Sequence, residues 1–152
     1  EDRFGKLTKT NSSIKNNLKI WLNQYRMISD TIDILDPYVI NLGIDFSIRT
    51  KVGADKFGTV NQCIAALSEY YKNGFFIGES VIISDIYNEL KNVPGVLDVL
   101  KVNLRIQTGA NYSGATIDIN KNLSPDGNQL IIPKNAIVEL KFPATDIRGK
   151  AK

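Results

Sequence analysis

The sequence predicts an α+β fold: a two-layer sandwich of a small mixed or antiparallel sheet with helices on one face, preceded by an N-terminal helix. Two segments alternate between apolar and polar residues, as strands with one buried face do. Three other segments repeat apolar residues at helical spacing. Amphipathic helices and strands bury their apolar faces against one another, which favours two layers.

The composition excludes several classes of chemistry. The chain has 152 residues, a net charge of +3 and 43% hydrophobic residues, which is typical of one globular domain. It has no histidine and one cysteine, Cys63, so the commonest general base and metal ligand are missing and no internal disulfide can form. We expect no catalytic residue, no cofactor, no metal and no small-molecule substrate.

The charge pattern also bears on partners. Lysine and arginine are interspersed with aspartate and glutamate, without the basic run that nucleic-acid binding favours. No apolar run is long enough to cross a membrane. We therefore expect neither nucleic acid nor a membrane as a partner. The sequence begins abruptly without methionine, so we expect a fragment of a longer protein.

The N-terminal part is predicted as a flexible arm over residues 1–11 and a helix over 12–30. Ser12 or Ser13 can cap this helix. One apolar stripe follows at helical spacing: Ile14, Leu18, Trp21 and Tyr25. For Trp21, packing in a core and anchoring an interface are equally expected, since tryptophan is enriched at interfaces.

The α+β domain is predicted over residues 31–143. Pro37 limits residues 31–35 to an edge strand at most. The first secure strand begins at Ile40 and places five apolar residues on one face: Ile40, Leu42, Ile44, Phe46 and Ile48. Helices are expected over 56–72, with Phe57 and Cys63 on or beside its buried face, and over 84–92, capped by Ser84.

The second half of this domain is predicted from a Pro94-Gly95 turn onward. A strand follows with Leu100, Val102, Leu104 and Ile106 on its buried face. A long polar loop is expected near 108–128, with room for a short strand at 116–119. Strand pieces are expected at 130–132 and 136–142. The C-terminal tail over 144–152 reads as too polar and too interrupted by glycine to join the core.

Several short stretches invite a chemical interpretation that their details do not favour. Asp30, Asp33 and Asp36 lack the EF-hand pattern, so solvated carboxylates are expected. Residues 124–129 are typical of an Asp-Gly turn. Residues 109–116 contain two glycines but no phosphate-binding motif and no following helix pattern.

Several stretches resemble a known family. LKIWLNQYRMISDTIDI, YVINLGIDFSI, NVPGVLDVLKV and FPATDIRG occur in the order found in the C-terminal region of the baseplate wedge protein of T4-like contractile-tailed bacteriophages, in the baseplate J-like group. The resemblance covers roughly residues 15–149, and the 108–128 loop has no strong counterpart in it. It implies a structural virion protein of the tail baseplate, which forms homodimers and contacts other wedge subunits.

Aromatic residues and arginine are favoured at interface cores, which gives our expected interface residues: Trp21, Tyr25, Arg26, Tyr112, Phe142 and Ile147. Two other functions remain open at this point. One is a ferredoxin-like module that binds a small molecule or has a regulatory role. The other is an enzyme that uses carboxylates, such as Asp33 with Asp45 or Glu89. Fold alone does not decide among them.

Overall fold

The computed structural model describes residues 6–152, which form an α+β fold with a mixed sheet, as the sequence predicts. The chain divides into two units, one that ends at Pro37 and one that runs from Tyr38 to Lys152. The arm expected over 1–11 lies partly outside the described residues. Its described part, residues 6–11, has no regular secondary structure.

The first unit contains one helix, α1 (Ser12–Asn23), which is shorter than the helix expected over 12–30. Its N-cap is Asn11 and not a serine: the Asn11 Oδ1 accepts a hydrogen bond of 2.9 Å from the Ser13 N–H. The helix ends early because its last residue, Asn23, is a poor helix former and the following backbone N–H groups bond three residues back. Residues 31–35 form no strand.

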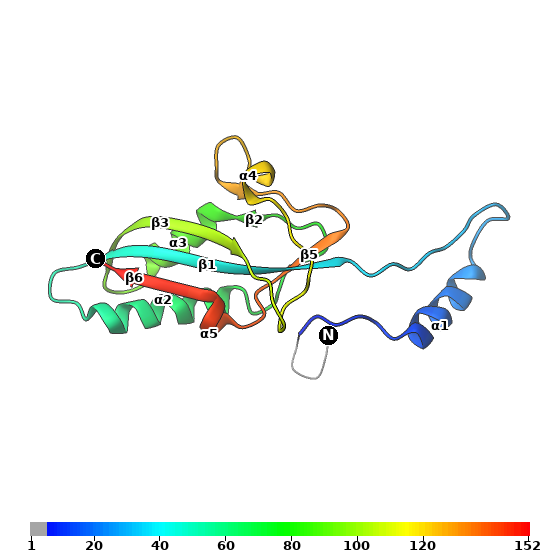
Figure 1. Ribbon diagram of the computed structural model, residues 1–152, viewed down its shortest axis with the longest axis horizontal. Helices are drawn as coiled ribbons and strands as arrows, with labels where there is room; N and C mark the ends of the chain where they lie inside the picture. The colour runs from blue at the N-terminus through cyan, green and yellow to red at the C-terminus, as the bar shows by residue number, and fades with distance from the viewer. Residues whose placement is uncertain (1–5) are drawn as a thin grey trace. The chain divides into compact units, whose positions relative to one another are not determined.

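The second unit is built around one long strand, β1 (Tyr38–Thr50) (Figure 1). β3 (Val96–Ile106) pairs with it in antiparallel fashion along one edge. Along the other edge, β5 (Ala136–Glu139) and then β6 (Ile147–Ala151) pair with it in parallel. The sheet is therefore mixed, and the strict alternation predicted from Ile40 onward sets its two faces.

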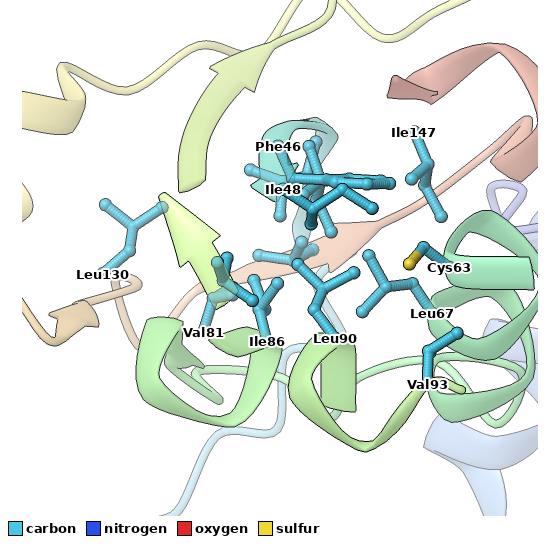
Figure 2. Packing of buried hydrophobic residues seen from close by; sticks show 14 of the residues in the cluster. Phe46, Ile48, Cys63, Leu67, Val81, Ile86, Leu90, Val93, Leu130 and Ile147 are labelled. Atoms are coloured by element: carbon cyan, nitrogen blue, oxygen red, sulfur yellow. The ribbon is translucent and has the colours of Figure 1, made fainter. Parts of the chain in front are cut away.

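Two helices, α2 (Lys56–Tyr70) and α3 (Ile83–Asn92), cover the apolar face of this sheet. Figure 2 shows Phe46 and Ile48 of β1 opposite Cys63 and Leu67 of α2. Two residues of α3, Ile86 and Leu90, are fully inaccessible. Phe57 is 77% exposed, so the expectation that it lies beside the buried face of α2 is wrong.

The remaining elements are short. β2 (Val81–Ile82) and β4 (Gln129–Leu130) pair as a separate two-stranded sheet. α4 (Ile119–Asn122) lies in the loop expected over 108–128, and the short strand expected at 116–119 does not form. Asp118 caps it by accepting hydrogen bonds from two backbone N–H groups, which favours a helical turn over a strand there. α5 (Pro143–Asp146) connects the ends of β5 and β6.

The C-terminal residues correct the expected boundaries of the domain. The tail expected over 144–152 forms the end of α5 and the whole of β6, and Ile147 is only 1% exposed. Glycine is required within this strand because a Cβ on Gly149 would lie 2.4 Å from Phe46 Cζ and 2.8 Å from Val60 Cγ1. The glycine that suggested an interruption instead allows α2 and the sheet to approach closely.

A β-bulge corrects the buried face predicted for β3. Ser47 pairs with Lys101 and Ile48 pairs with Val99, so Leu100 is the extra residue between them. Leu100 is 37% exposed, and Val99 is buried in its place. A bulge shifts the alternation by one residue, so the period of two predicted from Leu100 to Ile106 holds only beyond it.

Candidate functional site

The first candidate surface is α1, which has no buried residue within its own unit. Its apolar side chains lie in the open: Ile14 is 60% exposed, Trp21 53% and Tyr25 71%. The rings of Trp21 and Tyr25 contact each other, with 5.0 Å between their centroids. Packing of Trp21 in a core of this unit is thereby excluded for the described residues. An interface role remains a prediction.

The stripe on α1 has the spacing of a helix–helix seam. Steps of four and three residues lead from Ile14 to Leu18, Trp21 and Tyr25. This is the d-a-d-a pattern of a heptad repeat, which places knobs along one seam of a paired helix. The structure ends the helix at Asn23, so Tyr25 lies just beyond its last turn.

Two ion pairs join α1 to the segment that follows it. Lys15 lies 2.6 Å from the Asp36 carboxylate, and Lys19 lies 3.1 Å from that of Asp33. The bond from Lys15 lowers the pKa of Asp36. These carboxylates are thus solvated and ion-paired, as neighbouring acids at a surface usually are. Arg26 donates a 2.7 Å hydrogen bond to the carbonyl oxygen of Asp30.

The other predicted interface residues belong to the second unit, where the structure brings two of them, Tyr112 and Phe142, together around one buried carboxylate. Asp146 has no exposed surface. It accepts hydrogen bonds from the Tyr112 hydroxyl at 2.5 Å and from the Phe142 N–H at 2.8 Å. The rings of Tyr112 and Phe142 meet edge to face at 5.7 Å. The hydrogen bond to Asp146 raises the pKa of Tyr112.

Residues of the FPATDIRG stretch therefore make contacts within the second unit itself. Ile147 is packed in the core, which corrects the expectation that it lies at an interface. Phe142 is 38% exposed and Tyr112 is half-buried, so both retain some accessible surface. The predicted contacts of these two residues with a partner remain a prediction.

The same cluster holds the 107–117 loop over one end of the polar face of the sheet. Asn41 donates to Glu139 at 2.9 Å, and its Oδ1 accepts from the Ser113 N–H at 2.7 Å. Gln107 donates to Asp146 at 3.3 Å. Asn41 is therefore buried although it lies on the polar face, because this loop covers it.

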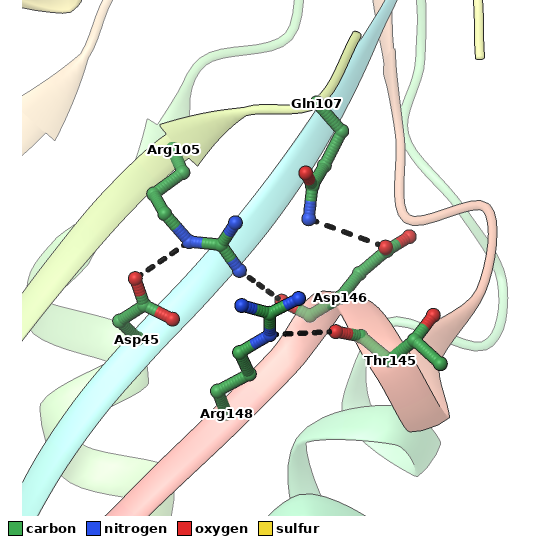
Figure 3. A network of polar contacts seen from close by, with 6 residues as sticks. All are labelled: Asp45, Arg105, Gln107, Thr145, Asp146 and Arg148. Carbon is green, nitrogen blue, oxygen red and sulfur yellow. Dashed lines mark hydrogen bonds and ion pairs between the residues drawn. The ribbon is translucent and has the colours of Figure 1, made fainter. Parts of the chain in front are cut away.

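The other end of the polar face is open and carries most of the cationic side chains of the sheet. Arg105 lies between Asp45, whose Oδ2 is 2.5 Å from its Nε, and the Asp146 carbonyl (Figure 3). Arg148 donates from Nε to the Thr145 carbonyl at 3.2 Å. A shallow hollow of about 350 Å³ lies among these strands. Sequence inspection missed this grouping because the cations come from separate strands.

Cys63, Asp45 and Glu89 belong to three different elements of the second unit, α2, β1 and α3. Burial raises the pKa of the Cys63 thiol to about 11, so it carries little of the reactive thiolate near neutral pH. Asp45 is on the open face of the sheet, whereas Glu89 belongs to the helix layer on the opposite face. Among residues 6–152, no cluster of three or more acidic or cysteine side chains is placed to hold a metal ion.

Two further observations concern turns and membranes. In the turn over 124–129, Ser124 donates to the Asp126 carboxylate, and hydrogen bonds from Ser124 and Asn128 lower the pKa of Asp126. This is turn chemistry, as the Asp-Gly pair indicates. Across the part of the chain that the structure describes, every helix is too short or too polar to cross a bilayer.

Neither the models of protein families nor the curated protein sequences match this chain.

Proposed function

We propose that this chain is a structural subunit of a bacteriophage tail baseplate wedge, which acts in the virion through self-association and contacts with other wedge subunits. The stretches that resemble the wedge family suggest this role. The observation that carries the self-association is α1, a helix with a heptad stripe and no buried residue in its own unit.

A partner helix would stabilise α1, which is short for a helix that buries no residue in its own unit. Isolated helices shorter than about 12–15 residues are marginal in water, and α1 has 12 residues. Fully burying one large apolar side chain stabilises by about 1.5–3 kcal/mol. Seating Ile14, Leu18 and Trp21 on a second helix therefore supplies the free energy that α1 lacks alone.

The occupant that we propose is α1 of a second copy. A stripe with a and d spacing is self-complementary, because each knob fits between the knobs of an identical helix. The two lysines of α1 do not oppose this pairing, since each is already ion-paired with an aspartate of its own chain. An isologous dimer of this kind is the commonest form of homo-oligomer.

Light scattering behind a sizing column, over a range of protein concentrations, tests the proposal. We expect a dimer near twice the 16.9 kDa chain mass and a shift to monomer in Trp21→Ala. Alanine is the best helix former, so this change removes the knob without opposing the helix. Phe57→Ala is the matched control, because Phe57 is an exposed aromatic residue of α2.

The outcomes are distinct. A dimer that survives Trp21→Ala would remove α1 from the interface. A strict monomer at every concentration would remove self-pairing and leave only contacts with other subunits. Loss of the dimer in both Trp21→Ala and Phe57→Ala would show a general effect of removing surface aromatic residues.

A further inference from the structure

The uncovered part of the polar sheet face presents two complete rows of side chains across three strands. Register pairs Ser47 of β1 with Lys101 of β3 and Lys150 of β6. The neighbouring row joins Asp45 with Asn103 and Arg148. Directly paired residues point to the same side of a sheet, so these side chains share one surface, which we call the cationic face.

The charge of this face is concentrated and mostly uncompensated. The single carboxylate of the two rows, Asp45, is neutralised by Arg105 at 2.5 Å. Within residues 6–152, no carboxylate lies at ion-pair distance from Lys101, Arg148 or Lys150. All three are exposed. The whole chain has a net charge of only +3, so this local excess is not a property of the average surface.

The spacing of the rows selects an extended ligand. Residues two apart on a strand, such as Arg148 and Lys150, lie about 6.6–6.8 Å apart on one face. An extended partner segment repeats its side chains at the same distance, so carboxylates at alternate positions meet successive rows. A helix repeats one face every 5.4 Å or so, which is shorter than the distance between the rows.

We propose that the cationic face is a docking surface for an extended acidic segment of a partner protein, with aspartate or glutamate at alternate positions. Carboxylates of this segment pair with Lys101, Arg148 and Lys150. The hollow of about 350 Å³ between these residues receives the side chains of the partner segment that face the sheet. The surface lies entirely in the second unit, so its role does not depend on α1.

A protein partner fits this face better than a nucleic acid does. Binders of single strands add aromatic stacking platforms to their basic grooves, and the two rows contain no aromatic side chain. The Asp45 carboxylate also lies in the middle of one row, where a backbone phosphate would face it. An acidic segment can place an uncharged residue at that point.

Fluorescence anisotropy tests the proposal with the full chain and a labelled peptide of alternating aspartate and threonine. We expect saturable binding that weakens as salt rises, since exposed ion pairs are screened. Binding should fall about tenfold in the double variant Lys101→Gln with Lys150→Gln, through loss of two exposed ion pairs. The double variant Lys56→Gln with Lys134→Gln removes the same charge away from the face and should bind as the unchanged chain does.

Each other result counts against the proposal. Absence of binding to the aspartate peptide, or equal binding of a matched asparagine–threonine peptide, overturns it. Equal losses in the two double variants would indicate attraction to net charge and overturn a defined face. Tighter binding of a DNA duplex or single strand, lost in the Lys101 and Lys150 variant, would assign the face to nucleic acid. Thermal melting of each variant confirms that it is folded.

Discussion

The hydroxyl of Tyr112 lies 2.5 Å from the carboxylate of Asp146, which has no exposed surface and lies 34 residues later in the chain. This contact joins the long loop after β3 to the turn that leads into β6. Buried carboxylates need hydrogen bonds to offset the loss of water. Asp146 obtains them from this hydroxyl, from Gln107 and from the Phe142 N–H.

Tyr112→Phe should therefore lower the free energy of unfolding by about 1–2 kcal/mol, because it removes one donor from a charged acceptor. Urea denaturation measures this change. Tyr38→Phe is the matched control: Tyr38 is 63% exposed, and we expect its variant to stay within about 0.5 kcal/mol of the unchanged chain. Equal effects in the two variants would mean that the Tyr112 bond contributes nothing specific.

The same bond gives a pH dependence of known sign. The neighbouring Asp146 raises the pKa of Tyr112 above its ordinary value of 10.0, so folding favours the protonated hydroxyl. The stabilisation is complete below pH 10 and is lost as pH rises through the raised pKa. The difference in unfolding free energy between the unchanged chain and Tyr112→Phe should shrink there, and a difference that grew with pH would contradict the contact.

Gly149→Ala should lower the unfolding free energy by about 1–3 kcal/mol through overpacking. The added Cβ would lie 2.4 Å from Phe46 Cζ and 2.8 Å from Val60 Cγ1, so β6 or α2 must shift. Gly114→Ala is the control, since a Cβ there meets nothing within 4 Å. Chemical denaturation of both variants checks this, and a neutral Gly149→Ala would show that β6 does not pack as described.

These glycines also show what the sequence could and could not predict. The alternation from Ile40 to Ile48 depends only on local periodicity, and both faces of β1 follow it. The Ile147-Gly149-Ala151 alternation of β6 was missed because glycine usually interrupts strands. Gly149 is needed here because Phe46 lies so close to it. This contact joins residues that are distant in the sequence, so no local pattern predicts it.

One of the two candidate surfaces could be predicted from local sequence spacing, and the other could not. The α1 stripe is local and was visible in the spacing of Leu18, Trp21 and Tyr25. The cationic face joins β1, β3 and β6, and its composition depends on register and on the bulge at Leu100. The expected spread of lysine and arginine along the chain is true of the sequence, yet pairing brings Lys101 and Lys150 together.

Cys63 should react with a thiol reagent only when the chain unfolds. The side chain is inaccessible, and burial raises its pKa from 9.0 to about 11, so both access and thiolate are lacking at pH 8. Modification rates in increasing urea should follow the unfolded population. Rapid modification without urea would show that α2 opens locally and would contradict this prediction.

The raised pKa of Cys63 also sets a direction for stability at high pH. The folded chain favours the neutral thiol, so this contribution is complete below pH 9 and is lost as pH rises toward 11. Relative to Cys63→Ala, the unchanged chain should lose about 2 kcal/mol of unfolding free energy over that range. The comparison with alanine removes the effects of tyrosine and lysine titration, which both proteins share.

Asn11→Ala should weaken α1 without affecting the sheet. The Asn11 side chain accepts from the Ser13 N–H at 2.9 Å, and loss of such a cap costs a helix about 1 kcal/mol. Because α1 contributes no buried residue, the urea transition of the second unit should not move. If α1 forms the dimer seam, both helices of the dimer lose a cap, and the dimer dissociation constant should rise about thirtyfold. Asn11→Asp keeps an acceptor at the cap and should restore the dimer, so a loss that persisted in Asn11→Asp would separate α1 capping from self-association.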